Sequence, residues 1–324
     1  MWPEAYSSGV RTSMTGGAAF EFHVQHAAAA LRDGLCELVL VSYGSDFLSR
    51  MGRSLGTAGF GGSRRVSGGT MWEAPYGLPL VGSYAMVAQR HMFEFGTTSE
   101  QLAEISVGVR EYASLNPLAM YRDPLTVDAV VSSRMIADPL HKLDCCVVSD
   151  GGGAYVIASP EVVADTKKPP VWIIGTGEAT KYRTNGGDIT TSAGAQSAPI
   201  AFAEAEVTPD EIDIAMIYDS FSITVLTMLE DLGFCAKGEG GAWVEGGRLR
   251  FDRPNDGPAL NTDGGGLSSN HPGMRGIFLL IEAARQLRGE SCSQVEGARL
   301  AVAHGNGGML GSRHSGGTVI LGGD

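Results

Sequence analysis

The chain has no long hydrophobic run, no excess of positive charge and no cysteine framework. No apolar stretch among its 324 residues approaches the ~20 residues of a membrane-spanning helix, and the start lacks the apolar core of a secretory signal. The net charge of −12 argues against a general nucleic-acid binder or anionic-membrane binder, and the lack of a long apolar run argues against membrane insertion. Five scattered cysteines without zinc-ligand spacing indicate reduced thiols, which are typical of a cytoplasmic protein.

Glycine, in contrast, is abundant. The 46 glycines are dispersed among ordered-looking segments, and 43% of the residues are hydrophobic, which predicts a globular core with many tight turns. A Lys-Lys-Pro-Pro stretch at 167–170 is the strongest boundary signal. We therefore expect an α/β chain with two units, residues 1–168 and residues 169–324.

Hydrophobic periodicity and local end signals predict the main elements. Thr98 and Gln101 form a capping-box pair before an apolar helical face, and Thr208 followed by Pro209 predicts another helical start. The expected helices cover residues 18–31, 83–114, 200–205, 222–232 and 276–288, with a loop-rich stretch at about 50–80. The expected strands cover residues 35–42, 145–157 with a glycine turn, 171–174, 212–221, and a terminal hairpin at 300–308 and 316–323. The strand at 35–42 is expected to be buried within a parallel α/β unit.

Two motifs in the last quarter place a histidine against glycine-rich backbone. Residues 261–276 read NTDGGGLSSNHPGMRG and contain His271, and residues 301–311 read AVAHGNGGMLG and contain His304. Glycines let a ligand approach the main chain closely, so backbone N–H donors and a proton carrier can meet at one small polar group. This combination predicts a site for enolate or oxyanion chemistry. The other histidines are expected to be structural.

Tyr218 and Asp219 close a predicted strand of the second unit. Ligands of parallel α/β sheets bind beyond the carboxyl ends of strands, so both are candidate site residues. The alternatives are core packing for Tyr218 and an N-cap role for Asp219.

Two other signals are weak. The stretch 175–180, GTGEAT, has only two of the three glycines of a dinucleotide-binding loop, and a turn after a core strand is the better interpretation. Two histidines without a third ligand argue against a metal site.

These motifs resemble those of the thiolase superfamily. NTDGGGLSSNHPGMRG resembles the family's Asn-x-x-Gly-Gly and Gly-His-Pro-x-Gly segments, with Asn270 where glycine is usual. AVAHGNGGMLG resembles the terminal Cys-x-Gly-Gly-Gly segment with His304 in place of the cysteine, and Tyr218–Phe221 resembles the Asn-Glu-Ala-Phe segment. The resemblance spans the chain and is closest to the sterol-carrier-protein-x or lipid-transfer-protein branch.

The resemblance implies a thiolase fold with two similar βαβ-type halves in five layers, α-β-α-β-α, and a homodimer. Residues 12–42 would carry the nucleophile segment and its helix, and residues of about 45–125 would form the inserted loop region over bound coenzyme A. Because that segment starts almost at Met1, the first half would lack its opening strand and helices.

The nucleophilic cysteine of the family has no counterpart. Its place falls on Gly17 or a neighbour (Gly16 or Ala18), Cys36 lies after the helix, and Ser13 is a poor substitute. A C–C lyase that performs a retro-aldol cleavage needs no acyl-enzyme, and related members work with a small OB-fold, zinc-ribbon partner.

For a lyase, the resemblance assigns roles to the candidate residues. The thioester oxygen would be held by His271 and nearby backbone amides. The coenzyme A part of the substrate would be bound by Gly265, Gly266, Ser268, Gly307 and Gly308. His304 or Tyr218 would carry the proton, and Asp219 would orient or relay it. The substrate would be a coenzyme A thioester, with no tightly bound cofactor. An acyltransferase of thiolase type and an inactive acyl-CoA-binding subunit remain the alternatives.

Overall fold

The larger sheet belongs to the second half of the chain. In this computed structural model, which describes residues 15–51, 71, 80–163, 166–182, 188–251, 257–310 and 313–323, its strand order is β5-β9-β8-β6-β7. Strands β8, β6 and β7 are parallel, whereas β9 runs antiparallel to both β5 and β8, which confirms the terminal hairpin. The strands are β5 (Trp172–Tyr182), β6 (Ile214–Ile217), β7 (Ala259–Leu260), β8 (Leu300–Met309) and β9 (Arg313–Gly322).

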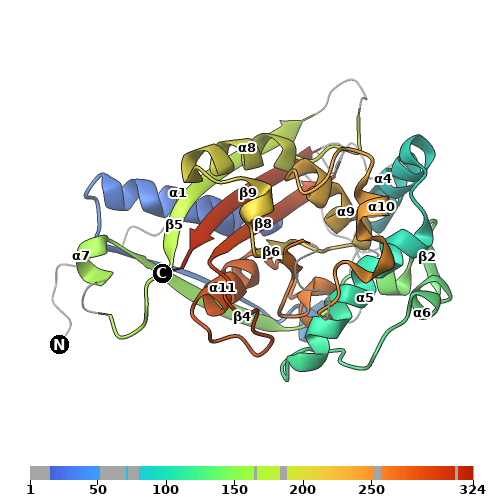
Figure 1. Cartoon of the computed structure of the whole chain (residues 1–324), viewed down its shortest axis with the longest axis horizontal. Coiled ribbons are helices and arrows are strands. Elements are labelled where there is room, and N and C mark those ends of the chain that lie inside the picture. The colour runs from blue at the N-terminus through green and yellow to red at the C-terminus, as the bar shows by residue number, and fades with distance from the viewer. Residues whose placement is uncertain are drawn as a thin grey trace.

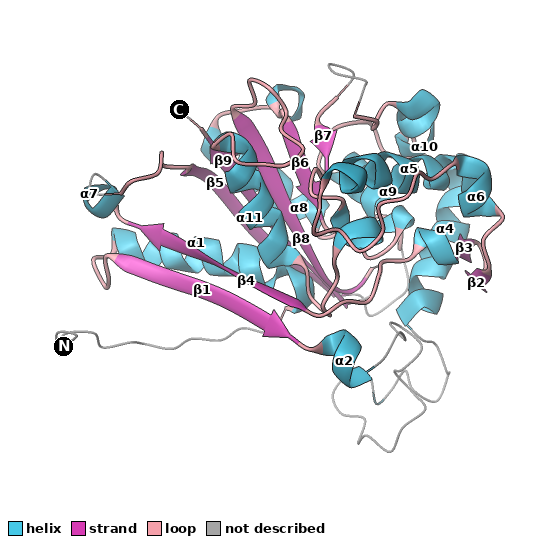
Figure 2. Ribbon diagram, turned by 90° about the horizontal axis from the view of Figure 1, so that it is seen from below, coloured by secondary structure: helices cyan, strands magenta, loops and turns pink. Residues whose placement is uncertain are grey.

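Helices cover both faces of this sheet. One face packs against α8 (Gly194–Ala205) and α9 (Ser222–Asp231), and the other against α1 (Ala19–Arg32) and α11 (Gly276–Leu287). Beyond α1 and α11 lies a second sheet of two strands, β1 (Leu38–Ser45) and β4 (Gly151–Ala158) (Figures 1 and 2). The described residues thus give the layers helix, sheet, helix, sheet, with α1 and α11 in the central layer.

The strand expected at 35–42 differs from the prediction in its setting. It pairs with β4 in antiparallel fashion, so it is not part of a parallel unit, and only one of its faces is covered. Val41 packs toward α1 and α11, whereas Leu40 and Val156 on the outer face are 63% and 56% exposed.

A helix followed by an antiparallel strand pair occurs in both halves. In the first half α1 precedes β1 and β4, and in the second half α11 precedes β8 and β9. In the second half this pair is extended by β5, β6 and β7. Among the described residues, the sheet that holds the first pair has two strands, β1 and β4, and the sheet that holds the second pair has five.

The insertion between β1 and β4 contributes helices that pack against the second half. Helix α4 (Leu80–Phe95) and helix α5 (Ser99–Leu115) both contact α9, and the capping box of Thr98 and Gln101 is present with both hydrogen bonds. This part of the prediction is confirmed, while residues 52–70 and 72–79 of the loop-rich stretch lie outside the described residues. The short elements are α2 (Phe47–Met51), α6 (Val127–Val131), β2 (Met135–Ala137), β3 (Leu140–His141), α7 (Pro160–Val163) and α10 (Gly240–Val244).

Several predicted boundaries were wrong, among them the end of a strand at 174 and the starts of α8 and β4. The stretch 175–180 continues β5 instead of turning, because α8 packs directly on it: a Cβ at Gly177 would lie 2.1 Å from the carbonyl oxygen of Ser197. Helix α8 begins at Gly194, six residues earlier than expected. The strand expected from residue 145 begins only at Gly151.

Candidate active site

Tyr218 and His271 meet on the face of the large sheet that α1 and α11 cover. Tyr218 directly follows β6, and its N–H donates to the carbonyl oxygen of His304 on β8 (3.0 Å). Its side chain packs beside Ala303, and its hydroxyl lies 3.0 Å from Nε2 of His271. The two rings are perpendicular, with centroids 5.5 Å apart. Two residues predicted separately, 53 positions apart, therefore form one buried pair.

The surroundings of His271 keep its ring neutral. Its backbone N–H donates to the hydroxyl of Ser149 (3.0 Å), which fixes the ring's position. Burial, and then the charge of Arg275, lowers its pKa to about 4. Within the described part of the chain, its buried Nδ1 has no hydrogen-bond partner. When Nε2 accepts the proton of Tyr218, Nδ1 carries the ring hydrogen and is free to donate to a ligand.

The ring of Tyr218 fills the space of a side chain at position 17, one of the positions where the family resemblance places the nucleophile. Gly17 precedes α1, and a Cβ built on it would lie 2.0 Å from Cε2 of Tyr218 and 2.6 Å from the carbonyl oxygen of Asn306. Real carbon atoms do not approach this closely, so no side chain fits at position 17. A side chain at position 17 and the ring of Tyr218 would therefore occupy the same space.

The other candidate nucleophiles are displaced or neutral. Cys36 lies beyond the far end of α1, and a helix of that length spans ~21 Å. Cys146, which the sequence analysis did not single out, lies near Tyr218 and Asp219, but burial raises its pKa well above the usual value and keeps it a thiol. Ser13 lies outside the described residues.

Asp219 faces away from Tyr218 and holds the segment before His271. Its carboxylate accepts hydrogen bonds from the N–H groups of Gly266 (2.7 Å) and Leu267 (3.1 Å) and pairs with Arg275 (3.6 Å). Burial raises its pKa to about 6, and Arg275 and the two amides oppose the rise, so the group is ionised at neutral pH. The alternative of a helix cap is wrong, because Phe221 is the N-cap of α9. Asp219 therefore holds the turn that leads to His271, and its carboxylate bonds Gly266, Leu267 and Arg275 instead of the Tyr218–His271 pair.

The same contacts account for three residues that were expected to bind the cofactor part of the substrate. Gly265 has a φ of 59°, and a Cβ there would lie 2.1 Å from Oδ2 of Asp219. Gly266 donates to Asp219, and the hydroxyl of Ser268 accepts from Nε of Arg110 (2.7 Å). These contacts shape the π-helical turn Gly265–Ser269 that leads into His271.

We expect Asp219→Asn to lower the free energy of unfolding by about 3 kcal/mol, because an amide cannot pair with the buried Arg275 or accept both N–H groups. Urea unfolding followed by circular dichroism measures this change. The exposed Asp210→Asn should stay within about 0.5 kcal/mol of the wild type. Equal stability of Asp219→Asn and the wild type would contradict this role.

His304 lies on the opposite face of the sheet from His271. Alternation along β8 directs Val302 and His304 toward α8, while Ala303 points toward α1 and α11. Nδ1 of His304 is 2.9 Å from the hydroxyl of Thr318, and burial lowers its pKa to about 3. The expected convergence of the two imidazoles is therefore not found, and Gly305 is the neighbouring residue that faces α1.

The glycine-rich part of β8 contacts the start of α1 and the inserted helix α4. A Cβ at Gly307 would overlap the carbonyl oxygen of Thr15, and the carbonyl of Gly308 accepts from the hydroxyl of Tyr84 (3.4 Å). Asn306 donates to the same hydroxyl (3.1 Å) and also bonds His314. Sequence analysis did not single out these two residues: Tyr84 lies in an ordinary apolar helical pattern, and within the glycine-rich motif 301–311 attention went to His304 and not to Asn306.

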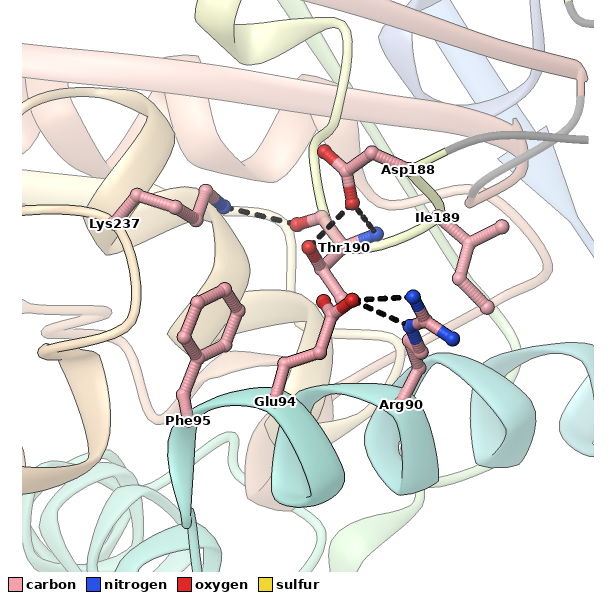
Figure 3. A pocket seen from close by; sticks show the side chains of 7 residues that line it. All are labelled: Arg90, Glu94, Phe95, Asp188, Ile189, Thr190 and Lys237. Atoms are coloured by element: carbon pink, nitrogen blue, oxygen red, sulfur yellow. Dashed lines mark hydrogen bonds and ion pairs between the residues drawn. The ribbon is translucent and has the colours of Figure 1, made fainter.

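A separate cavity of about 500 Å³ opens beside the end of α4 (Figure 3). Its cations are already paired: Arg90 lies 2.5 Å from Glu94, and Lys237 contacts Glu230 and Asp231 at 3.0 and 2.8 Å. It therefore offers a phosphate little uncompensated charge. In the described residues no group of three histidine, cysteine or acidic side chains could hold a metal, and no helix there could cross a bilayer.

Comparisons with known proteins identify the family. A family model described as "Thiolase C-terminal domain-like" matches residues 175–322. The steroid side-chain-cleaving aldolase of Thermomonospora curvata is 36% identical over 298 residues, which are 86% of this chain and 73% of that protein. The chain belongs to the thiolase superfamily. The acetyl-CoA acetyltransferase of Methanothermobacter thermautotrophicus is 42% identical over 246 residues, and this thiolase-superfamily chain spans 63% of its length.

The branch and the fold are also shown. Sterol carrier protein 2 of Bos taurus is 32% identical over 232 residues, 68% of this chain and 42% of that protein. A solved structure described as an Ltp2-ChsH2(DUF35) aldolase superposes with a TM-score of 0.82 at 32% identity, covering 96% of this chain and 78% of its own. The predicted thiolase fold and its sterol-carrier-protein branch are thus confirmed.

Proposed function

We propose that this thiolase-superfamily chain cleaves the Cα–Cβ bond of a β-hydroxyacyl-CoA in a retro-aldol reaction. The observation that carries the proposal is the position of Tyr218, whose ring excludes a nucleophile at residue 17 and whose hydroxyl pairs with a neutral imidazole. A retro-aldol step needs a base for the β-hydroxyl proton and donors for the enolate oxygen, but no acyl-enzyme. The coenzyme A thioester is the substrate, and no tightly bound cofactor is required.

Tyr218 and His271 supply both the base and the hydrogen-bond donor that the bond-breaking step needs. The oxygen of Tyr218 accepts the β-hydroxyl proton of the substrate while its own proton passes to Nε2 of His271. The Cα–Cβ bond breaks, the β-carbon becomes a carbonyl, and the electron pair moves into the thioester enolate. The imidazolium that forms donates from Nδ1 to the enolate oxygen. Backbone N–H groups of Gly307 and Gly308 remain candidate donors, and His304 has no part in this step because it faces α8.

The test is a comparison of two substrates with the purified protein. A β-hydroxyacyl-CoA should be cleaved to a carbonyl product and a shorter acyl-CoA without added coenzyme A, as followed by liquid chromatography and mass spectrometry. Cleavage of a β-ketoacyl-CoA alone, dependent on free coenzyme A, would instead show thiolysis and overturn the proposal.

An acyltransferase is the second candidate, because Cys146 places a thiol near Tyr218. An acyltransferase would transfer the labelled acyl group of an acyl-CoA to Cys146 as a thioester, and Cys146→Ala would abolish this labelling. The proposed lyase retains its activity in Cys146→Ala, since the raised pKa of that thiol keeps it protonated.

We also propose a homodimer and a small OB-fold, zinc-ribbon partner. Support comes from the similarity to an aldolase whose description names a second component.

If the chain were an inactive acyl-CoA-binding subunit, replacing His271 would leave turnover of the complex unchanged.

A further inference from the structure

Glu21 is a buried carboxyl group that the mechanism above does not use. It lies on α1, four residues after Gly17, which belongs to the 3₁₀ turn Gly16–Ala18 that precedes the helix. Its side chain is 2% exposed, and neither carboxyl oxygen has a hydrogen-bond partner among the described residues. An unpartnered buried carboxyl is costly, and such groups concentrate at functional sites.

Glycines of three different elements make room for this carboxyl. A Cβ at Gly305 on β8 would lie 1.9 Å from Oε2 of Glu21, and a Cβ at Gly276, the first residue of α11, would lie 2.7 Å from it. At Gly317 on β9 the Cβ would lie 2.7 Å from Cβ of Glu21. Glu21 therefore occupies the space of a side chain at position 305, as Tyr218 occupies that of a side chain at position 17.

The space that Glu21 fills beside Gly305 is next to the space that Tyr218 fills beside Gly17. The carbonyl oxygen of Gly17 and Oε2 of Glu21 lie 2.1 and 2.7 Å from the same point, the Cβ position of Gly276. Gly17 in turn contacts the ring of Tyr218. The carboxyl thus lies beside the backbone of Gly17, the residue that packs on the ring of Tyr218, on the same face of the large sheet.

We propose that Glu21 is the general acid that protonates the α-carbon of the enolate, an inference that rests on the proposed retro-aldol function. In this step the O–H bond of Glu21 breaks, a C–H bond forms at the α-carbon, and the enolate electron pair returns to a neutral thioester. Glu21 is left as a carboxylate, and His271 holds the proton taken from the substrate. After the products leave, that proton returns to Glu21, so no other reactant is consumed.

The environment keeps Glu21 in the form that the step needs. Burial raises its pKa to about 8, so the carboxyl is protonated at neutral pH. Among the elements that pack on α1, β4 contributes the titratable Tyr155, whose hydroxyl donates to the carbonyl of Phe20 (2.8 Å). Burial raises the pKa of Tyr155 too, so it stays neutral. The adjoining residues of β8, β9 and α11 are the three glycines.

Exchange of α-protons in deuterium oxide isolates this step from bond cleavage. With a saturated acyl-CoA, which has no β-hydroxyl, wild-type protein should exchange the α-protons, and Glu21→Gln should slow the exchange about 10²-fold. Glu282→Gln is the matched control, because Glu282 is equally buried but bonds Thr262 and Ser291 away from the pair. It should exchange at the wild-type rate.

The outcomes separate the two proposals. If the wild type cleaves β-hydroxyacyl-CoA and exchanges α-protons while Glu21→Gln exchanges as fast, the role of Glu21 is overturned and the function stands. If the wild type neither cleaves β-hydroxyacyl-CoA nor exchanges α-protons, the proposed function fails, and the proposed role of Glu21 fails with it. Should Glu21→Gln not fold, the wild-type profile decides: exchange should rise with pH as the carboxylate base forms near the group's pKa of about 8. A rate that is flat from about pH 6 to about pH 9 overturns the role.

Discussion

Replacing Tyr218 with phenylalanine should lower kcat for β-hydroxyacyl-CoA cleavage about 10²- to 10⁴-fold, the range measured for loss of a general acid–base. The variant keeps the ring that packs against Gly17 and removes only the hydroxyl that bonds His271. Its stability should fall by about 1 kcal/mol, since one buried hydrogen bond is lost. Steady-state kinetics and urea unfolding on the same preparation separate the two effects.

Tyr112→Phe provides the matched control. Tyr112 is as buried as Tyr218, but it lies on α5 and stacks edge-to-face on Phe251 (5.5 Å). We expect kcat to stay within about twofold of the wild type, as for other changes remote from the chemistry. A Tyr218→Phe variant that cleaves the substrate at the wild-type rate would remove the proton relay from the mechanism.

The pairing of Tyr218 with His271 was accessible from the sequence because each residue has a local signal. Tyr218 follows an apolar run that ends in polar residues, and His271 follows a glycine-rich turn. Strand ends and glycine turns gather at one edge of an α/β sheet, so two such signals can be expected to meet. The same locality explains why the capping box at Thr98 and the terminal hairpin were predicted correctly.

The face that His304 occupies could not be read from the sequence. Strand β8 is buried on both sides, so its apolar residues run continuously and carry no alternation that distinguishes one face from the other. A shift of one residue then moves a side chain to the other face. The family motif directed attention to His304, whereas the residue that faces α1 is Gly305.

The burial of Glu21 could not be predicted from the sequence either, because it depends on tertiary packing. A glutamate in a helix is most often on a solvated face. Helix α1, however, lies in the central layer between two sheets, and it buries Phe20, Glu21 and Phe22 in succession. Only the packing of α1 between β8 and α11 turns that carboxyl into a buried group.

Introducing a cysteine at position 17 should not create a thiolase. We expect Gly17→Cys to lower the free energy of unfolding by about 3 kcal/mol, because its Cβ overlaps both the ring of Tyr218 and the backbone carbonyl of Asn306. The ring can be displaced, but the carbonyl belongs to β8 in the middle of the large sheet and cannot move without breaking strand pairing. Urea unfolding measures the loss, and mass spectrometry after incubation with acetyl-CoA tests for an acyl-enzyme.

Two further variants locate the cause of that loss. Gly44→Cys places the same side chain on β1, where a Cβ meets no atom within 4 Å, and should be nearly neutral. Adding Tyr218→Ala to Gly17→Cys removes the overlap with the ring and leaves the 2.6 Å approach to Asn306. The double variant should therefore be less destabilised than the sum of its two single variants, because the two positions share one volume. A stable Gly17→Cys protein that accumulates an acyl group would show that the tyrosine does not exclude the nucleophile, and the case for a lyase without covalent catalysis would lose its structural basis.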